Sequence, residues 1–334
     1  MRDVLIVGAG PSGLATAIAA KQHGLDYVLV EKGVLVNSIF NFPTHMVFFT
    51  TPELLEIGGL PLTTPFEKPT RLEALRYYRR VVETYGLQIS FHEEVVSIER
   101  EDDVFAVTSA DVGAGAGLQA GPPARRAREA RAVVLAIGYY DHPNCLGVPG
   151  EHLPHVSHYY SEAHPYFRRR VVIVGGRNSA AETALELFRA GAQVTLVHRG
   201  AQLGDSIKYW VRPDIENRIK AGSIAARFET RVVEITPHTV AVERAGAREE
   251  IPADAVLLLT GYRPDVPLMQ RAGIRCDEQT LAPELDPETF ETNVPNLFIA
   301  GGAVAGRNTG SIFIENGRFH GERIVKVLAE RLRA

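Results

Sequence analysis

Short apolar runs that end at a glycine recur along the chain. They are VLIVG at 4–8, AVVLAIG at 132–138, VVIVGG at 171–176 and AVLLLTG at 255–261. Runs of this length, rich in β-branched residues, are typical of parallel strands buried on both faces, whereas a membrane-spanning helix needs about 20 apolar residues. The pattern predicts an α/β fold with parallel sheets.

The first apolar run leads into a glycine-rich turn that suits a dinucleotide. Gly8-x-Gly10-x-x-Gly13 is followed by an alanine-rich helix and by a second strand that ends in an acid, 23 residues after Gly8. The glycines permit a tight turn, close approach of the backbone to a pyrophosphate and close helix–strand packing. The helix N-terminus offers free N–H groups to phosphate, and the acid would hold ribose hydroxyls. The predicted contacts are Gly8, Gly10, Pro11, Ser12, Gly13, Glu31 and Lys32.

The same arrangement returns after the third apolar run. The position 23 residues after Gly175 is His198, followed by Arg199. A carboxylate there would repel a 2′-phosphate, whereas these side chains can bind one, which favours NADPH. The alternative is two ordinary surface residues at a strand end. Arg177 replaces the middle glycine and must point away from the loop or lie across the cofactor. The predicted NADPH contacts are Gly175, Gly176, Arg177, Asn178, Ser179, Ala180, His198, Arg199, Lys208 and Gly261.

Two further segments favour a flavin in the first module. ARAVVLAIGYYDHPNCLGVPGE and NVPNLFIAGGAVAGRNTGSIFIENGRFHGERIVKVLAERL resemble the segments that close the flavin domain of flavoprotein reductases. That class usually has Ala-Thr-Gly and Gly-Asp where this chain has Ala-Ile-Gly and Gly-Gly, so neighbouring groups must replace the missing carboxylate. The further residues predicted to bind FAD are His45, Val95, Ala136, Gly138, Gly301, Gly302, Asn308 and Ile312.

The predicted organisation is two Rossmann-like, doubly wound, three-layer domains, the second inserted in the first. We place an FAD domain at 1–152 plus 262–334 and an NADPH domain at 153–261, because both crossings carry prolines, as linkers tend to do. Residues 92–134 alternate like a small β-meander. The Gly/Ala/Pro/Arg-rich stretch at 111–131 is interpreted as a mobile loop without chemical role, with an arginine docking patch as the alternative.

Composition and charge limit the classes of binding partner and the cellular compartment to be expected. A net charge of −4 over 334 residues gives no electrostatic reason to expect nucleic acid or an anionic membrane. The N-terminus enters a strand at once, unlike a secretory signal. Two cysteines, Cys145 and Cys276, cannot form a disulfide framework in a chain of this size, which indicates a reducing cytoplasm.

Longer segments of the chain indicate a family more specifically than the two glycine turns do. The stretch from Asn41 to Val81, together with HYY…HPYFRRRVVIVGGRNSAAE, SIKYWVRPDIENRIKAG and GSIFIENGRFHG, resembles the bacillithiol disulfide reductase family over nearly the whole chain. The resemblance implies an FAD enzyme that oxidises NADPH to reduce the disulfide of a small thiol, and homodimers are usual in its thioredoxin-reductase-like superfamily. Many members have cysteine where this chain has Ser12, which puts a thiol relay at that position in doubt.

The chain lacks the dithiol of thioredoxin reductases. Their Cys-x-x-Cys lies just before the second glycine turn, where this chain has His158 and Ser161. His158 and His45 are therefore the candidates for giving a proton to a leaving thiolate. Neither cysteine is expected to have a redox role, since neither belongs to an evident Cys–His pair. The linker histidines are not expected to bind a metal, because no matching carboxylate or cysteine set is evident.

Two other functions share these modules. A ferredoxin– or flavodoxin–NADP reductase also lacks the dithiol, and the acceptor would then be a redox carrier protein. A flavin monooxygenase is a weaker alternative, because the Phe-x-Gly-x-x-x-His motif is absent before the second turn. A non-catalytic NADPH sensor is the last alternative. The fold alone does not distinguish between these functions.

Overall fold

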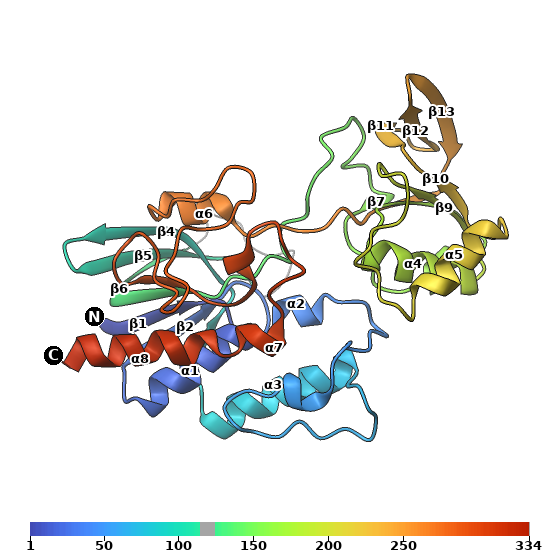
Figure 1. The fold of residues 1–334 in the computed structure, drawn as a ribbon. Helices are drawn as coiled ribbons and strands as arrows, with labels where there is room; N and C mark the ends of the chain where they lie inside the picture. Colours follow the sequence, from blue (N-terminus) through green and yellow to red (C-terminus); the bar gives the residue numbers. More distant parts are fainter. Residues whose placement is uncertain (114–123, 334) are drawn as a thin grey trace. The chain divides into compact units, whose positions relative to one another are not determined.

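The computed structural model describes residues 1–113 and 124–333. The chain forms two compact units, a first unit of Met1–His142 with Tyr262–Ala334 and a second unit of Pro143–Gly261 (Figure 1). The second unit is thus inserted in the first. The crossing into it lies after residue 142, ten residues before the boundary predicted from the sequence.

Hydrogen bonds tie residues 143–152 to the second unit and explain this shift. The Asn144 N–H donates to the Gly261 carbonyl at 2.9 Å, and the Thr260 hydroxyl donates to the Asn144 carbonyl at 2.6 Å. Leu146 packs against the apolar core of the same unit. Pro149 and Pro154, on which the first predicted boundary rests, therefore lie inside the second unit.

The two chain segments that connect the units are also hydrogen-bonded to each other within the first unit. The Arg263 N–H donates to the His142 carbonyl at 2.9 Å. The His142 imidazole in turn lies 3.6 Å from a carboxylate oxygen of Asp265. The chain therefore leaves the first unit and re-enters it at one place.

The first unit is built on a seven-stranded sheet. Its order is β3-β2-β1-β6-β5-β4, and β15 pairs with β6. The strands around β1 are parallel, and β4, β5 and β6 form an antiparallel meander. The strands are β1 (Arg2–Val7), β2 (Tyr27–Glu31), β3 (Ile89–Phe91), β4 (Glu93–Glu101), β5 (Val104–Asp111), β6 (Arg125–Leu135) and β15 (Leu297–Ile299).

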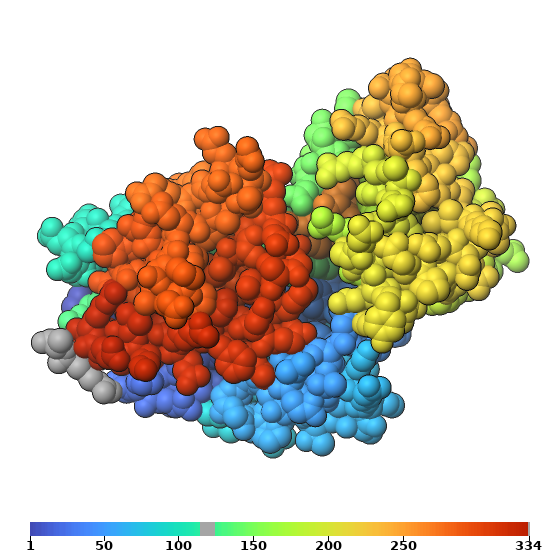
Figure 2. Space-filling model, viewed as in Figure 1, coloured from blue at the N-terminus to red at the C-terminus, as the bar shows by residue number. Residues whose placement is uncertain are grey.

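Helices cover this sheet, and the C-terminal helix packs directly on the first one. A Cβ on Gly321 would lie 2.6 Å from the Thr16 backbone nitrogen, so α8 approaches α1 closely only because this residue is glycine. The C-terminal residues, red in Figure 2, cover much of the visible face of this unit. The helices and 3-10 turns are α1 (Pro11–Gln22), α2 (Asn37–Phe40), η1 (Pro52–Leu54), α3 (Arg71–Tyr85), α6 (Val266–Arg271), η3 (Gly301–Ala305), α7 (Ile314–Gly317) and α8 (His320–Arg333).

The second unit repeats the parallel design on a smaller scale. A five-stranded parallel sheet has the order β10-β9-β8-β14-β7, and a separate antiparallel sheet has the order β11-β12-β13. Its elements are β7 (Val156–Ser157), η2 (His164–Tyr166), β8 (Arg170–Val174), α4 (Asn178–Arg189), β9 (Gln193–Val197), α5 (Arg212–Lys220), β10 (Ala225–Arg227), β11 (Arg231–Ile235), β12 (Thr239–Arg244), β13 (Ala247–Pro252) and β14 (Ala255–Leu258).

The arginine-rich end of the stretch at 111–131 is a strand, not a loop. β6 begins at Arg125, and residues 114–123 lie outside the described residues. The Arg128 guanidinium donates to both oxygens of the buried Glu93 carboxylate, at 2.6 and 3.0 Å. Burial alone would raise the pKa of Glu93, but hydrogen bonds, first among them those from Arg128, lower it to about 2. The interpretation of this end as a loop is wrong because its arginines neutralise a buried acid.

The predicted α/β class is confirmed. Buried apolar residues line both faces of each parallel sheet, as expected for strands without polar alternation. Within the described part of the chain, no helix combines the length and the apolar character that a membrane crossing requires.

Candidate functional site

The turn after β1 is packed so tightly that two of its glycines have no room for a side chain. Gly8 has a φ of 103°, and a Cβ there would lie 2.5 Å from the Ala136 carbonyl oxygen. A Cβ on Gly13 would lie 1.8 Å from the Gly8 carbonyl oxygen. Gly10 has an ordinary φ of −74°, and no atom lies within 4 Å of a Cβ built on it. Gly8 and Gly13 thus serve packing, and Gly10 leaves open space at the N-terminus of α1 for a phosphate.

Glu31, at the end of β2, closes the same turn. Its buried carboxylate accepts hydrogen bonds from the N–H groups of Ala9 and Gly33, each at 2.7 Å. Burial raises the pKa of Glu31, and these hydrogen bonds oppose the shift. A carboxylate has about four lone-pair sites, so two remain for ribose hydroxyls. The Lys32 ammonium, predicted as a cofactor contact, lies 3.1 Å from a carboxylate oxygen of Asp141.

The first turn meets the C-terminal segment at Ser12. The Ser12 hydroxyl donates to the Gly317 carbonyl at 3.2 Å. A Cβ on Gly301 would lie 2.6 Å from the Ser12 Oγ, and Gly301 has a φ of 75°. Ser12 is therefore part of the junction between the first glycine turn and the C-terminal segment.

His320 supports this junction, although it is not among the residues predicted from the sequence. Its Nδ1 accepts a hydrogen bond from the Gly301 N–H at 3.2 Å, and its ring stacks on Phe290 with centroids 4.0 Å apart. Burial, and then the charge of Arg323, lower the pKa of His320 to about 4. It is therefore a neutral acceptor at neutral pH. No spacing in the sequence distinguishes this histidine from the others.

The Tyr139 ring fills the space beside Gly302. A Cβ on Gly302 would lie 2.6 Å from the ring Cε1. The Tyr139 hydroxyl donates to the Thr309 carbonyl at 3.4 Å, and burial raises its pKa. The Gly-Asp pair usual in flavoprotein reductases would therefore collide with this tyrosine, which accounts for the second glycine.

Replacing Gly302 with alanine is expected to displace Tyr139 and to weaken flavin binding about tenfold or more, because overpacking costs about 1–3 kcal/mol. The ratio of flavin to protein absorbance in the purified protein measures the effect. Gly310→Ala is the matched control, since the nearest atom to a Cβ there is 3.9 Å away. Equal flavin content in the two variants would show that Tyr139 does not constrain this turn.

The other residues predicted to bind FAD are spread over the first unit. Val95, on β4, is buried in the core beneath the sheet, so its side chain packs rather than facing outward. Gly138 has a φ of 60° and open space around it. Asn308 and His45 are exposed, and Ile312 is half-buried. The first turn, Glu31 and the C-terminal junction are the part of this set that the structure brings together, and they fit a dinucleotide.

The second glycine turn, after β8, leaves room for a histidine ring. A Cβ on Gly175 would lie 2.6 Å from the Leu259 carbonyl oxygen and 2.9 Å from the Ala180 Cβ. The Ala180 side chain, in the place of a third glycine, therefore lies against Gly175, where no side chain would fit. A Cβ on Gly176 would lie 2.4 Å from the Nδ1 of His198. Position 176 must therefore be glycine, because the His198 ring at the end of β9 occupies the space that a side chain would need.

Three basic side chains gather beside this turn. His198 is half-buried, and Arg177 and Arg199 are exposed. Burial, then the charges of Arg199 and Arg177, lower the pKa of His198. A phosphate dianion would be attracted by both arginines and by the N-terminus of α4, and it would raise the pKa of His198. The residues present fit the 2′-phosphate of NADPH.

Asn178 and Lys208 hold the segment that follows this basic cluster. The Asn178 side-chain amide donates to the Ser206 carbonyl at 2.9 Å and accepts from the Lys208 N–H at 2.9 Å. The Lys208 ammonium lies 5.9 Å from the centroid of the Trp210 ring. Ser179 is exposed in the first turn of α4. Two of the predicted NADPH contacts therefore also have structural partners.

Glu182, on α4, is a titratable group that the motif did not indicate. Burial raises its pKa to about 7, although the charge of Lys208 opposes the shift. The charge of Glu186, one turn further, raises the pKa of Glu182 as well. Burial, and then the charge of Glu186, raise the pKa of the buried Tyr160. The two acids lie one turn apart on the same polar face of α4 as Asn178 and Arg189, so the sequence pattern gave no signal that singles them out.

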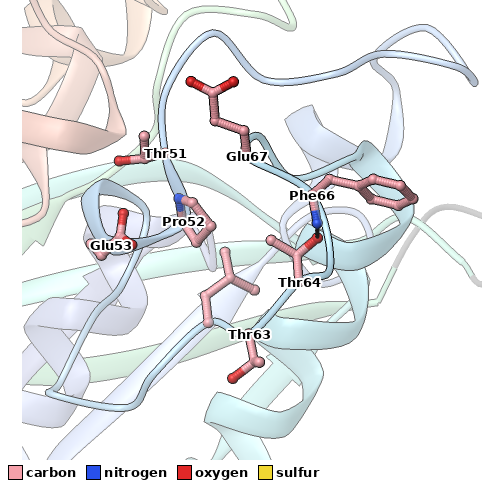
Figure 3. A pocket seen from close by; sticks show the side chains of 8 residues that line it. Thr51, Pro52, Glu53, Thr63, Thr64, Phe66 and Glu67 are labelled. Carbon is pink, nitrogen blue, oxygen red and sulfur yellow. Dashed lines mark hydrogen bonds between the residues drawn. The ribbon is translucent and has the colours of Figure 1, made fainter.

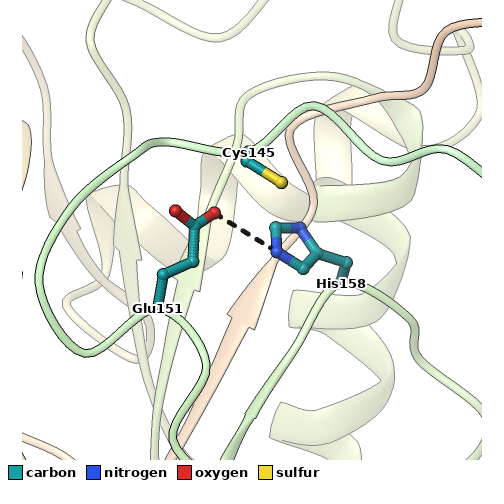
Figure 4. A group of neighbouring side chains, drawn as sticks. All are labelled: Cys145, Glu151 and His158. Carbon is teal, nitrogen blue, oxygen red and sulfur yellow. Dashed lines mark ion pairs between the residues drawn. The ribbon is translucent and has the colours of Figure 1, made fainter. Parts of the chain in front are cut away.

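His158 lies beside a carboxylate and a thiol in the second unit (Figure 4). Its Nε2 is 3.3 Å from a carboxylate oxygen of Glu151, and the Cys145 sulfur completes a group whose ligand atoms all lie within 4.8 Å of one another. The predictions that no carboxylate or cysteine matches the linker histidines, and that Cys145 has no histidine beside it, are therefore wrong. The loop at 145–151 folds back onto the end of β7, which spacing does not reveal.

A cavity of about 390 Å³ in the first unit is lined by the chain segment that connects α2 to α3 (Figure 3). The Phe66 N–H donates to the Thr64 hydroxyl at 3.2 Å on its wall. It belongs to the segment that carries much of the family resemblance, yet none of the predicted site residues lines it. Its lining is Thr51, Pro52, Glu53, Leu62, Thr63, Thr64, Phe66 and Glu67.

Comparison with known proteins agrees with this geometry. Residues 5–301 match the family described as pyridine nucleotide-disulphide oxidoreductase. Bacilliredoxin reductase Bdr of Bacillus subtilis (strain 168) is 42% identical over 330 residues, which are 98% of this chain and 97% of that protein. A ferredoxin–NADP reductase of Ignicoccus hospitalis is 26% identical over 308 residues, 90% of each chain.

The fold agrees with the same relationship. The solved structure of bacillithiol disulfide reductase Bdr from Bacillus cereus has a TM-score of 0.94 to this chain at 41% identity, over 99% of both chains. The predicted resemblance and the two Rossmann-like modules are confirmed. The chain therefore belongs to the pyridine nucleotide-disulphide oxidoreductase family, as a flavoprotein reductase that uses FAD and NADPH.

Proposed function

We propose that this protein reduces bacillithiol disulfide with electrons from NADPH. The observation that carries the proposal is the likeness over the whole chain, at 41–42% identity, to Bacilliredoxin reductase Bdr and to bacillithiol disulfide reductase Bdr. The first of these relatives is named for bacilliredoxin, so a redox carrier protein is the second candidate acceptor. The ferredoxin–NADP reductase is a more distant relative, at 26% identity.

The first unit binds and orients the flavin in this proposal. FAD would accept a hydride from NADPH and pass the electrons on to the disulfide. Gly10 and the N-terminus of α1 face its pyrophosphate, and Glu31 accepts from the adenosine ribose. Ser12 and Gly301 hold the C-terminal segment against the first turn, as their packing supports.

The second unit selects the nicotinamide cofactor. The turn at Gly175 and Gly176 and the N-terminus of α4 face the pyrophosphate of NADPH. Arg199, Arg177 and His198 bind its 2′-phosphate, which their mutual proximity supports. Asn178 and Lys208 hold the adjoining segment in position.

The thiolate that leaves the disulfide must be protonated. His45, exposed in the loop between α2 and α3, and His158, beside Glu151, are the proposed donors. Burial raises the pKa of the Cys276 thiol, which makes it a poor thiolate at neutral pH. A relay through Cys276 is therefore not part of the proposal.

We further propose that the enzyme works as a cytoplasmic homodimer. The small number of cysteines, two in 334 residues, fits a reducing compartment. Sedimentation analysis of the flavin-loaded protein tests the dimer, and a monomer at assay concentration would contradict it.

Anaerobic NADPH oxidation tests the acceptor. The purified flavoprotein is assayed with bacillithiol disulfide, with oxidised bacilliredoxin and with ferredoxin or flavodoxin, each against a sample without acceptor. We expect turnover on bacillithiol disulfide, and we expect it to persist in the Cys145→Ser, Cys276→Ser double variant. Turnover confined to ferredoxin or flavodoxin would overturn the proposal. Turnover that requires bacilliredoxin would replace the small disulfide with the carrier protein, and peroxide formation in air would favour a monooxygenase.

A further inference from the structure

We propose that Cys145, Glu151 and His158 form a binding site for one thiophilic divalent cation, with Zn²⁺ as the ion that fits best. Thiolate, imidazole and carboxylate are the three ligand types that protein zinc sites use. The three side chains point toward one another in Figure 4. The site lies within the second unit and does not depend on the acceptor of the reductase.

The spacing of the ligand atoms suits a tetrahedral ion. Metal–ligand distances of about 2.0–2.2 Å for nitrogen and oxygen place these atoms roughly 3.3–3.6 Å apart on a tetrahedron. The observed separation between the His158 Nε2 and the Glu151 carboxylate is 3.3 Å. The Cys145 sulfur lies within 4.8 Å of both, and about 3.6 Å is needed at a zinc–sulfur distance of about 2.3 Å. A small rotation of the exposed cysteine side chain supplies the difference.

The Glu151 carboxylate is held in a fixed orientation. Its two oxygens accept hydrogen bonds from the N–H groups of Leu146 and Gly147, each at 2.7 Å. Its side chain is 2% exposed, and the His158 side chain is 13% exposed. Each oxygen keeps a further lone pair, and partners of this kind are what orient metal ligands. Two of the three ligands are therefore positioned before an ion arrives.

Charge favours a divalent cation at this point. The carboxylate and the thiolate together carry two negative charges when His158 is neutral, and Zn²⁺ balances them. Binding would release the thiol proton, so affinity should rise with pH. Because Cys145 is exposed, the ion can enter from solvent, and water can occupy the fourth position.

A bound ion would change the roles of these residues. It would tie the loop at 145–151 to the end of β7 and stabilise the second unit. It would also engage the imidazole of His158, so that His45 would be the remaining candidate proton donor. Loading with zinc is then expected to alter the second unit without changing the flavin content.

Metal retention by the FAD-loaded protein tests the site. Wild type, Cys145→Ser and Cys276→Ser are incubated anaerobically with Zn²⁺ or Co²⁺, freed of unbound ion by gel filtration, and analysed for metal per chain. The Co²⁺ samples are also examined at wavelengths longer than those at which oxidised flavin absorbs. We expect about one ion per chain, with tetrahedral Co²⁺ bands, in wild type and in Cys276→Ser, and a loss of both in Cys145→Ser.

Alkylation gives a second readout. Zn²⁺ is expected to protect Cys145, but not Cys276, from iodoacetamide, as measured by mass spectrometry of the peptides. Cys145 is exposed, so its serine variant should fold, and its flavin content verifies this. Equal metal content in wild type and Cys145→Ser, or no retained metal in wild type, would overturn the proposal.

Discussion

Replacing Gly13 with alanine is expected to prevent the first unit from folding, whereas Gly10→Ala should fold and fail to retain flavin. A Cβ at Gly13 would lie 1.8 Å from a backbone oxygen, so β1 and α1 would have to separate. The cost exceeds the roughly 1–3 kcal/mol of ordinary overpacking, in a fold whose stability is about 5–15 kcal/mol. At Gly10 no protein atom lies within 4 Å, so only the bound phosphate meets the added methyl group.

Two measurements separate these outcomes. Circular dichroism and thermal melting report folding, and the ratio of flavin to protein reports binding. Gly13→Ala should be insoluble or lack the cooperative transition of wild type, while Gly10→Ala should melt cooperatively and be colourless. A yellow, folded Gly13→Ala protein would contradict the packing argument. Normal flavin content in Gly10→Ala would show that the pyrophosphate lies elsewhere.

Replacing His198 and Arg199 together with alanine is expected to raise the KM for NADPH about 100-fold and to leave the KM for NADH unchanged. Each hydrogen bond to a charged phosphate contributes about 1.5–3 kcal/mol, and about 1.4 kcal/mol corresponds to a factor of ten. Steady-state kinetics with both cofactors measure the effect. Arg231→Ala, an exposed arginine of the same unit, is the control. An unchanged KM for NADPH would mean that the pair is ordinary surface.

The pH dependence gives an independent check on His198. Burial, then its arginine neighbours, lower the pKa of the free imidazole, so it is neutral at neutral pH. A bound 2′-phosphate raises this pKa. NADPH affinity should therefore increase as the pH falls through the pKa of the complex and level off below that of the free enzyme. Arg199→Ala should retain this dependence, and His198→Ala should lose it.

The spacing of residues near one another in the chain was enough to predict both glycine turns. Gly8, Gly13 and Gly175 lie within a few residues of the strand and helix that they connect, so local sequence determines the packing at those points. The acid at the end of β2 and the basic pair at the end of β9 follow from the same short repeat. The α/β class followed from the uninterrupted apolar runs for the same reason.

Contacts between distant residues could not be predicted in this way. Tyr139 lies against Gly302, and His320 accepts a hydrogen bond from Gly301, through the tertiary packing of the C-terminal segment. Cys145 lies beside His158 because the loop at 145–151 folds back onto the end of β7. Arg128, on β6, donates to Glu93, on β4, across the antiparallel strands. These pairings depend on tertiary packing, and no periodicity in a single sequence encodes them.

The paired crossings have a consequence for how such a protein can be assembled. His142 and Arg263 on one side, and Asn144 and Gly261 on the other, are joined by backbone hydrogen bonds. For the fold of the first unit, the entire second unit is therefore equivalent to a short loop that connects two neighbouring residues, His142 and Arg263. Because the inserted unit is folded and holds its own ends together, it adds little closure entropy, and for any loop this cost rises only slowly with length. Recombination at this junction could exchange one nicotinamide module for another while the flavin unit keeps its fold, so cofactor preference is a separable, modular property of this architecture.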